Sequence, residues 1–434
     1  MSDITAIGIT NWRNQQQVFG IKTGDRLGHI YCLGKTGSGK STLLLNMAIA
    51  DIEQGRGIGI IDPHGDLAEE ILNYIPEERI KDVIYFNATD TDFPIAFNPL
   101  SDALEQDRYL VAATIVTTLK KLWADSWGPR LEHILRNTLI SLSYYSKSTL
   151  LDIVPMLTNH EFRKQVLYAV PTLSILDFWH KEFEPLSPQL KNEFIAPIVN
   201  KVGLFTSHPV LRNILGQQHS TIDIASIMNT QKIFIANISK GVLGEAGSQI
   251  LGSLLVTQFQ TAALGRATRP IHNRMPFYLY IDEVHSFITK SFADILSESR
   301  KYGLSLFLTH QFIDQLPEEI YTSVLGNVGT LISFRVGSRD ARILEEEFFP
   351  VFSQSDLINL PRYHIYIKLL IDGSTSKPFS AVTLGMKESS GSYKKELIVY
   401  SQNKYGRLIS EVEQELANKY QRKGKESATT LFSE

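Results

Sequence analysis

The stretch HIYCLGKTGSGKSTLLLNMAIADI, residues 29–52, joins an apolar run to a helical pattern through a glycine-rich loop. Its residues 34–41 match the pattern Gly, four residues, Gly, Lys and then Ser or Thr, which is typical of phosphate-binding loops. The glycines let backbone N–H groups face inward, and the helix that follows contributes the positive end of its dipole. The sequence therefore predicts a site for a nucleoside triphosphate between a buried strand and a helix.

The residues of this loop are expected to divide the contacts with the nucleotide among them. Lys40 is expected to reach the β- and γ-phosphates, and the Ser41 hydroxyl is expected to bind Mg²⁺. The expected cofactors are therefore ATP and Mg²⁺. The predicted nucleotide-binding residues are Gly34, Lys35, Thr36, Gly37, Ser38, Gly39, Lys40, Ser41 and Thr42.

Apolar runs with the length of strands recur along the chain, with helical patterns between them. They cover residues 29–34, 57–62, 82–87, 232–238, 276–283, 304–311, 329–336 and 363–371. Nearly continuous apolar strands that alternate with helices indicate a mostly parallel sheet, because such strands are buried on both faces. The predicted fold class is therefore α/β.

A change of pattern interrupts this core. From about residue 101 to residue 230, apolar residues recur at helical spacing and prolines divide the region into short pieces. This pattern predicts an all-α domain inserted in the core. The predicted units are residues 1–100, the N-terminal part of the core; 101–230, the insertion; 231–386, the rest of the core; and 387–434, a polar helix followed by a disordered tail.

Composition limits the class of protein without identifying a partner. A chain of 434 residues with 43% hydrophobic residues can bury a large core, and its net charge of −3 neither favours nor excludes a nucleic-acid partner. The single cysteine, Cys32, excludes an internal disulfide and a cysteine-based metal cluster. The sequence contains no signal-peptide or membrane-span pattern, so we expect a soluble intracellular protein.

Two adjacent carboxylates follow the apolar run of FYLYIDEVHSF, residues 277–287. They are expected at the carboxyl end of a buried strand, where α/β sheets bind their ligands. Asp282 is expected to hold Mg²⁺ through water, and Glu283 to act as the general base that polarises the attacking water. The alternative is a strand that simply ends in two solvated acids. The Glu directly after the Asp favours a hydrolase over a kinase.

A third acid ends the strand-like run of GIGIIDPHGD, residues 57–66. Asp62 is expected at the same edge of the sheet, where it either helps to position Mg²⁺ or water or caps the sharp turn formed by Pro63 and Gly65. The residues alone leave both alternatives open. His64 is interpreted as a turn residue rather than a base.

The segment SRKYGLSLFLTHQF, residues 299–312, has polar residues at both ends of an apolar strand. Gln311 is expected to contact the γ-phosphate or the attacking water, because its amide both donates and accepts hydrogen bonds. Arg300 lies towards the opposite end of the strand, so it is expected to reach the nucleotide of a neighbouring subunit as an arginine finger. The alternative for Arg300 is a solvated cation at a helix end near Glu298.

Arg335 is a second candidate for a contact with phosphate. It lies late in the apolar run 329–336, where a charge is costly unless it is paired. Arg339, on the loop beyond, is less constrained, and either arginine could instead pair with an acid. The predicted catalytic residues are thus Glu283, Gln311, Arg300, Arg335 and Asp62, and the predicted metal ligands are Ser41 and Asp282.

Taken together, these motifs resemble the ATPase domains of the FtsK/HerA superfamily of P-loop motor proteins. The resemblance is closest to the coupling proteins of conjugation and type IV secretion, the TraD/TraG kind. It covers roughly residues 26 to 385 and depends on the order of GKTGSGKST, IIDPHGDL, FNPL, HPVLRNILGQ, TIDIASIMNTQKIFIANISKG, YIDEVHSF, SRKYGLSLFLTHQF and NVGTLISFRVGSRDA. It implies a RecA-like core, an inserted all-α domain, a hexameric ring and ATP-driven movement of DNA through its channel.

The resemblance also implies partners and a location. The implied partners are DNA, further copies of the chain in a homohexamer, and secretion or relaxosome proteins. Coupling proteins carry N-terminal transmembrane helices, whereas no such span precedes Gly34 here. We therefore expect a cytoplasmic protein that its partners recruit to the inner face of the membrane. The alternative functions are a secretion ATPase acting on protein cargo, with the all-α insertion as receptor, and an assembly scaffold switched by nucleotide.

Overall fold

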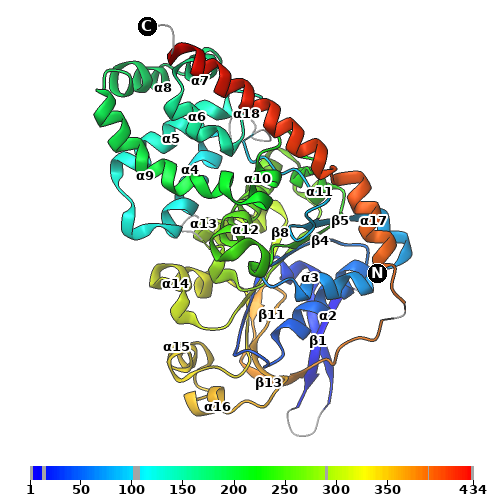
Figure 1. Ribbon diagram of the computed structural model, residues 1–434. Helices are drawn as coiled ribbons and strands as arrows, with labels where there is room; N and C mark the ends of the chain where they lie inside the picture. The colour runs from blue at the N-terminus through cyan, green and yellow to red at the C-terminus, as the bar shows by residue number, and fades with distance from the viewer. Residues whose placement is uncertain (1–2, 12–15, 101–107, 289–291, 390, 432–434) are drawn as a thin grey trace. The chain divides into compact units, whose positions relative to one another are not determined.

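The computed structural model describes residues 3–11, 16–100, 108–288, 292–389 and 391–431, without the side chains of 293–295 and 421–431. They form two compact units (Figure 1). The first unit comprises residues 1–86, 224–239 and 262–401, and the second comprises residues 87–223, 240–261 and 402–434. The chain therefore passes between the two units several times.

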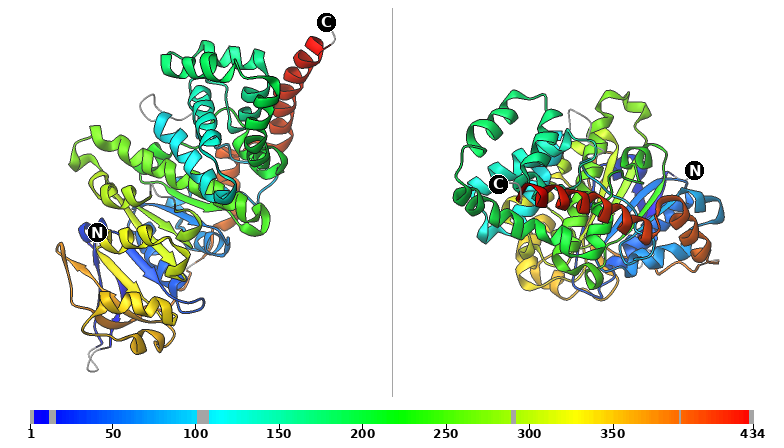
Figure 2. Two further views of the ribbon diagram at one scale, coloured as in Figure 1. Left: turned by 90° about the vertical axis from the view of Figure 1, so that its left-hand side faces the viewer. Right: turned by 45° about the horizontal axis from the view of Figure 1, so that its top comes forward.

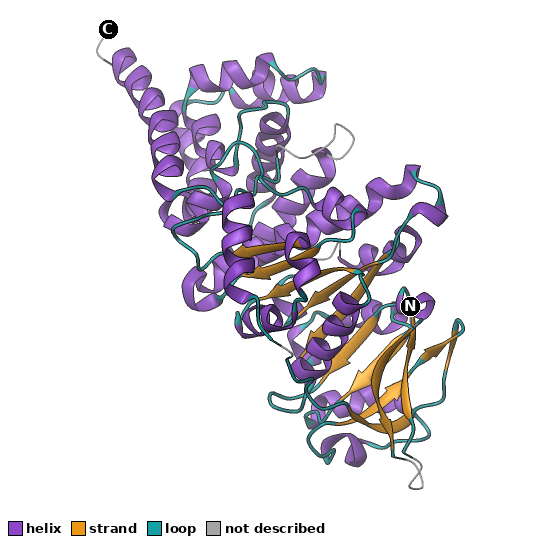
Figure 3. Cartoon of the chain, turned by 90° about the vertical axis from the view of Figure 1, so that its right-hand side faces the viewer, coloured by secondary structure: helices purple, strands orange, loops and turns teal. Residues whose placement is uncertain are grey.

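An eleven-stranded sheet forms the centre of the first unit, in the order β2-β1-β13-β10-β9-β3-β8-β7-β4-β6-β5. Figure 3 draws the strands as orange arrows. Parallel pairing joins β9, β3, β8, β7, β4 and β6, whereas β10, β13, β1 and β2 extend the sheet in antiparallel pairs. The strands are β1 (Ile4–Thr10), β2 (Val18–Lys22), β3 (Ile30–Leu33), β4 (Gly57–Asp62), β5 (Val83–Asn87), β6 (Ile233–Asn237), β7 (Phe277–Ile281), β8 (Leu304–His310), β9 (Thr330–Ser333), β10 (His364–Lys368) and β13 (Phe379–Thr383); β11 (Leu370–Ile371) and β12 (Ser374–Thr375) form a separate hairpin.

Burial follows this division of the sheet. Every residue of β3, β4, β7 and β8 is buried, as expected for parallel strands covered on both faces. In β10, buried and half-buried residues alternate, as in an antiparallel strand with one face closer to solvent. The prediction of an α/β fold with a mostly parallel sheet is confirmed, and the antiparallel extension is a feature that the apolar runs did not distinguish.

Helices cover the sheet, and α2 (Lys40–Glu53) is the one that follows the glycine-rich loop. Its residues Leu43, Leu44 and Met47 pack into the core with residues of the strands. The other helices of this unit are α1 (Thr23–Arg26), α3 (Asp66–Ile71), α11 (Ile224–Asn229), α13 (Phe292–Glu298), α14 (Glu318–Asn327), α15 (Ser338–Phe348), α16 (Gln354–Ile358) and most of α17 (Lys394–Tyr405).

The strand register places the predicted site residues at one edge of the sheet. Leu33 pairs with His310, and Ile61 pairs with Ile281. The residues that directly follow these strands, among them Gly34, Gln311 and Asp282, must therefore emerge at the same edge, because parallel strands end in the same direction.

The second unit is built mainly from helices. They are α4 (Arg108–Leu122), α5 (Pro129–Ser143), α6 (Ile153–Thr158), α7 (His160–Tyr168), α8 (Leu173–Asp177), α9 (Pro188–Ser207), α10 (Pro209–Leu215), most of α12 (Lys240–Leu264) and α18 (Ile409–Leu431), the red helix of Figure 2. Pro129, Pro188 and Pro209 begin helices, where the missing N–H group costs nothing. The rings of Trp179 and Phe183 pack edge to face in the core of this unit.

The limits of the units differ from those expected. The helical unit begins at residue 87 rather than 101, because the backbone of Phe97 bonds to Ile214 within this unit while the loop itself has no helical periodicity. Two C-terminal helices, α17 and α18, replace the single helix expected, and α18 continues to Leu431, into the segment expected to be disordered. Lys, Glu, Gln and Ala in that segment have high intrinsic helix propensity.

Candidate nucleotide-binding site

The glycine-rich loop connects β3 to α2 in a conformation that needs glycine. Gly37 has φ of 72° and Gly39 has φ of 124°, which L-residues with side chains rarely adopt. A Cβ atom on Gly39 would also lie 2.8 Å from the ring of Tyr363. The loop is thus closed against a residue that lies more than three hundred positions further along the chain.

Backbone hydrogen bonds hold the loop at the ends of neighbouring strands. The N–H of Lys35 donates to the carbonyl of Arg335 at 2.8 Å, and the N–H of Tyr363 donates to the carbonyl of Ser38 at 2.8 Å. The N–H of Gly34 donates to the carbonyl of His310 at 3.3 Å. These bonds fix the loop before any ligand is bound, so the site is largely preorganised.

Lys40 places its ammonium group inside the loop. This residue is buried, and its Nζ donates to the carbonyls of Gly34 at 2.5 Å and Lys35 at 3.3 Å. Ser41 is exposed at the start of α2, and Thr42 beside it is half-buried. A phosphate group that enters the loop would meet the Lys40 ammonium, with the Ser41 hydroxyl beside it.

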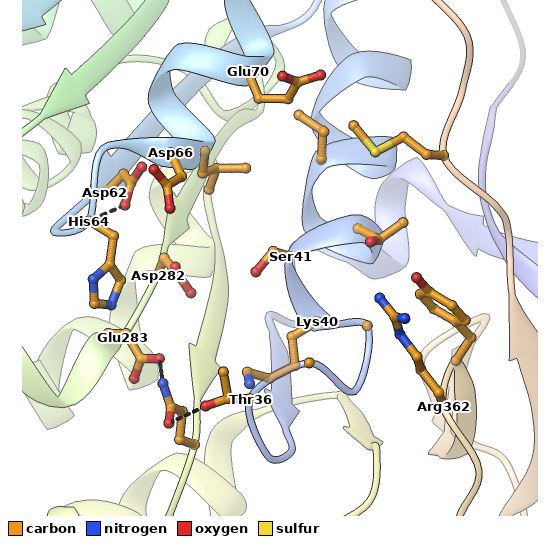
Figure 4. Close-up of a pocket in the computed structure, with 18 residues that line it drawn as sticks. Thr36, Lys40, Ser41, Asp62, His64, Asp66, Glu70, Asp282, Glu283 and Arg362 are labelled. Carbon is orange, nitrogen blue, oxygen red and sulfur yellow. Dashed lines mark hydrogen bonds between the residues drawn. The ribbon is translucent and has the colours of Figure 1, made fainter.

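A cavity of about 600 Å³ lies above the loop (Figure 4). Thr36, Lys40 and Ser41 line it from the loop and α2, and the carboxylates of Asp282 and Glu283 line it from the end of β7. The structure therefore brings together the two predicted motifs, a phosphate loop and a pair of acids. A nucleoside triphosphate is of the right size for such a cavity.

Asp282 is a buried carboxylate with one close hydroxyl partner. Thr309 Oγ1 donates a hydrogen bond to Asp282 Oδ1. Burial raises the pKa of Asp282; the Thr309 hydrogen bond opposes this rise, and the nearby charges of Asp62 and Glu283 add to it. A divalent cation at this carboxylate would relieve that accumulation of negative charge, so Asp282 and the exposed Ser41 hydroxyl fit a role as Mg²⁺ ligands.

The described residues offer no cluster of three or more His, Cys, Asp or Glu side chains arranged to hold a metal by themselves. Such sparse protein ligation suits Mg²⁺, which is usually bound by one or two protein groups together with water and substrate phosphates.

Glu283 has an unusual backbone and two side-chain partners. Its φ of 46° and ψ of 54° lie in the left-handed region, and such strain is concentrated at functional sites. Its Oε1 accepts a hydrogen bond from Gln311 Nε2, and its Oε2 lies 3.3 Å from Nδ1 of His285. Burial raises the pKa of Glu283, but the contacts with His285 and Gln311 outweigh burial and leave the pKa lowered. The carboxylate is therefore ionised at neutral pH, as a general base must be.

Gln311 connects this base to the phosphate loop. Its Oε1 accepts a hydrogen bond from Thr36 Oγ1 at 2.9 Å while its Nε2 donates to Glu283 (dashed lines in Figure 4). The side chain is half-buried at the wall of the cavity. Gln311 therefore connects the hydroxyl of Thr36 in the loop to the carboxylate of Glu283.

Behind Glu283 lies a pair of histidines that the sequence analysis did not single out. The rings of His285 and His310 stack with centroids 5.1 Å apart, and Nδ1 of His310 lies 3.1 Å from the Tyr31 hydroxyl. Burial lowers the pKa of His310 to about 3, with a further contribution from His285, so the His310 ring is neutral at physiological pH. His310 packs on the ring of His285, and His285 contacts Glu283, so the stacked rings help to orient the Glu283 carboxylate.

Asp62 shows the contacts of a turn cap. Its Oδ1 accepts from the N–H of His64 at 2.8 Å, and its Oδ2 accepts from the N–H of Ala68 at 2.9 Å, so both oxygens are occupied by backbone. The carboxylate is fully buried at the cavity wall, and His64 is exposed in the turn. These contacts correspond to the capping alternative, and the charge of Asp62 reaches the metal site through its effect on Asp282.

The two arginine candidates lie outside the cavity lining. Arg300 is exposed in the turn before β8, and a seven-residue strand separates it from Gln311 by about 23 Å. The premise for Arg335 was wrong: β9 ends at Ser333, and the Arg335 side chain is exposed rather than buried late in a strand. What Arg335 contributes is its carbonyl, which anchors Lys35. Arg339 is exposed and pairs with Asp314 at 3.1 Å.

Arg362 and Tyr363 are site residues that the sequence analysis missed. Both line the cavity, and they precede the antiparallel strand β10. The sequence carries no motif around them, and only the strand order, with β10 beside β9 and β9 beside β3, brings them to the loop.

The fold and the site define the class of protein: a phosphate loop and acidic strand ends at one edge of a largely parallel sheet form the RecA-like P-loop fold. No protein-family model matches the chain, and a search of curated proteins finds no significant match.

Solved structures do match. The plasmid coupling protein TrwB, in complex with the non-hydrolysable GTP analogue GDPNP, has a TM-score of 0.64 at 18% identity, over 86% of this chain and 89% of that chain. The unbound monoclinic form of the conjugative coupling protein TrwBdeltaN70 has a TM-score of 0.65 at 18% identity, over 88% of this chain and 90% of that chain. VirB4 of Thermoanaerobacter pseudethanolicus has a TM-score of 0.61 at 13% identity, over 91% of this chain and 99% of that chain. The predicted RecA-like fold, and the resemblance to coupling proteins at the level of the fold, are confirmed.

Proposed function

We propose that this chain is a Mg²⁺-dependent ATPase that moves DNA, as a motor of conjugation or type IV secretion. The observation that carries the proposal is the hydrogen-bonded series from Thr36 through Gln311 to the ionised Glu283. A protein that only binds nucleotide has no need of a base connected to its phosphate loop. Structures of TrwB in complex with ADP and Mg²⁺ and with a non-hydrolysable ATP analogue support the choice of ligands.

The reaction follows from the residues of the cavity. Lys40 exchanges its loop carbonyls for phosphate oxygens, which places the γ-phosphate near Glu283. Glu283 accepts a proton from water as the water oxygen bonds to the γ-phosphorus, and the bond to the bridging oxygen breaks to release ADP. Mg²⁺ held by Ser41 and Asp282 would neutralise charge on the phosphates. A bound γ-phosphate would compete with Thr36 and Glu283 for the Gln311 amide, and the return of these two contacts after the γ-phosphate leaves would signal hydrolysis.

DNA as the substrate, and the ring, follow from the likeness to coupling proteins rather than from the site. We place Arg300 at the nucleotide of a neighbouring subunit in a homohexamer, because it lies at the opposite end of β8 from its own site. None of the helices in the described part of the chain has the length and apolar character needed to cross a bilayer. From the likeness to coupling proteins, we propose that secretion or relaxosome partners recruit the chain to the inner face of the membrane.

The test is the rate of ATP hydrolysis by the purified chain against protein concentration, with Mg²⁺ or EDTA and with single-stranded or double-stranded DNA. The proposal predicts a rate that needs Mg²⁺, rises as subunits assemble and increases with DNA. Equal hydrolysis with and without DNA, together with no DNA binding at low salt, would exclude DNA as the substrate and favour protein cargo. Lys40→Ala is expected to abolish turnover, and Glu283→Gln to leave ATP bound and uncleaved.

The arginine finger has its own test. Subunits carrying Arg300→Ala and subunits carrying Lys40→Ala are each expected to be inactive. Mixed rings should regain some turnover where an intact loop meets an intact arginine. Stable mixed rings without activity would contradict the role of Arg300 and leave Arg335 as the remaining candidate.

A further inference from the structure

Arg362 and Tyr363 lie on the wall of the cavity away from the catalytic acids. Figure 4 shows Asp282 and Glu283 on one side, Arg362 on the other, and Lys40 and Ser41 between them. We propose that Arg362 and Tyr363 form a stacking surface that binds the base of the nucleotide. The proposal deepens the function above and depends on the site's binding a nucleoside triphosphate.

The direction of the nucleotide in the cavity follows from the chemistry of hydrolysis. The γ-phosphate must lie at Glu283, because the attacking water gives up its proton there. The loop and Lys40 hold the phosphates in the middle of the site. The nucleoside is then left on the side away from Glu283, where Arg362 and Tyr363 line the cavity.

The backbone of Tyr363 is fixed relative to the phosphate loop. Its N–H donates to the Ser38 carbonyl at 2.8 Å, and its carbonyl accepts from the N–H of Thr383 at 2.9 Å. Its φ of 67° is uncommon for a residue with a side chain, and this conformation costs free energy. Folded proteins tolerate such a cost chiefly at functional sites, where a side chain must be held in one place. The ring packs against Gly39, so the distance between the aromatic face and the phosphate-binding groups is set in advance.

Arg362 supplies a second planar group beside that ring. Its guanidinium carbon lies 4.6 Å from the centre of the Tyr363 ring, and its side chain is exposed to the cavity mouth. Among the residues that the structure describes, no carboxylate is within ion-pair distance of this guanidinium, so the face turned away from Tyr363 is available. Planar guanidinium groups stack on aromatic rings and on bases, which makes the pair a suitable surface for a purine.

Stacking does not read the hydrogen-bonding edge of a base, since every base has an aromatic face. Among the described residues that line the cavity, the one side-chain amide is Gln311, which is bonded to Thr36 and Glu283, while Met386, which is half exposed, adds apolar contact. The site is therefore expected to bind MgATP and MgGTP with affinities within about tenfold of each other. Selectivity would be for a nucleoside triphosphate as a class.

The experiment compares nucleotides with inorganic tripolyphosphate, which has the phosphates but no base. Isothermal titration calorimetry measures the affinity of the full chain for MgATP, MgGTP and Mg-tripolyphosphate. The wild type is compared with Arg362→Ala and Tyr363→Ala. Each substitution is expected to weaken nucleotide binding by about 5- to 150-fold and to leave tripolyphosphate binding within twofold. Arg339→Ala, which removes an exposed arginine outside the cavity, is the matched control and should bind all three ligands as the wild type does.

Conservative variants separate stacking from charge. Tyr363→Phe keeps the ring and should bind MgATP as the wild type does, whereas Arg362→Lys keeps the charge without the plane and should lose most of the affinity that Arg362→Ala loses. An equal loss of ATP and tripolyphosphate affinity in Arg362→Ala would place the guanidinium on phosphate and overturn the inference. Nucleotide binding at wild-type strength in both alanine variants would also overturn it. A wild-type chain that binds none of the three ligands would refute the proposed function itself.

Discussion

Replacement of Gln311 by alanine isolates the connection between the phosphate loop and the general base. The variant removes the hydrogen bond that Gln311 Nε2 donates to the ionised Glu283 and the one that its Oε1 accepts from Thr36. Both partners keep their own positions, because Glu283 retains the contact with His285 and Thr36 belongs to a loop held by backbone bonds. The expected defect is therefore in catalysis rather than in nucleotide binding.

The size of the effect follows from the charge on Glu283. A hydrogen bond to a charged group contributes about 1.5–3 kcal/mol. Gln311 is half-buried, so water replaces part of the lost bond, and the pKa of Glu283 is expected to rise towards the ordinary glutamate value. Loss of a positioned partner of the base should also lower kcat by about 10- to 100-fold at neutral pH, which is less than the roughly 100- to 10,000-fold that a general base contributes as a whole.

The sign of the pH effect is defined. The folded protein lowers the pKa of Glu283, so the base is active above that pKa and activity is lost as the pH falls through it. Because the variant raises the pKa, the acid limb of its kcat profile should move to higher pH. The assay is kcat and KM for ATP from about pH 3.5 to 8, a range that extends below the ordinary pKa of a glutamate, with stability followed by circular dichroism.

A matched control is available in Gln249→Ala. It removes a hydrogen bond of the same type, from Gln249 Nε2 to Glu245 Oε1, on an exposed part of α12. That variant should show wild-type kinetics. If Gln311→Ala kept a wild-type kcat and an unmoved acid limb, or if it raised KM while leaving kcat intact, Gln311 would not be the link that the structure suggests.

Three further predictions concern the loop, the metal site and the core. Gly39→Ala should abolish the binding of a fluorescent ATP analogue, because the added Cβ would lie 2.8 Å from the Tyr363 ring. Normal affinity of the variant for the analogue would show that the loop is more adaptable than its contacts imply. Thr309→Val removes the hydroxyl that donates to Asp282. The Mg²⁺ concentration required for half-maximal hydrolysis should therefore rise severalfold. An unchanged Mg²⁺ titration would contradict the role of Asp282 as a metal ligand. Asp51→Ala leaves the fully buried Arg26 without its carboxylate partner and should lower the free energy of unfolding, measured with urea, by about 3–5 kcal/mol. Asp314→Ala removes the exposed ion pair with Arg339 and should lower it by about 0–1 kcal/mol.

Much of the site could be predicted because parallel strands deliver their following residues to a common edge. Lys40, Asp282, Glu283 and Gln311 each lie directly beyond a buried strand or its loop, and strand order alone brings them together. A motif recognised in the sequence therefore also locates its residues in space. The α/β class follows from the same apolar runs, because a fully buried strand cannot carry regularly spaced polar residues.

What could not be predicted depends on the ends of strands and on long-range pairing. Arg335 was expected in a strand that ends two residues earlier, and beyond that end the side chain turns to solvent. The stacking of His285 on His310 depends on rotamers that no spacing determines. Arg362 and Tyr363 reach the loop only through an antiparallel strand, whose place beside β9 is not specified by hydrophobic pattern.

The strand order has a consequence for biosynthesis. β3, which carries the phosphate loop, pairs only with β8 and β9 in the finished sheet. At about 5–20 residues per second, the ribosome needs roughly 15–55 s to move from the end of β3 to the end of β8. During that interval both edges of a fully apolar strand have no native neighbour, while most of the helical unit has already emerged. Nascent chains that stop before β8 should therefore depend on chaperones, and the ATPase site should be among the last parts of the protein to form.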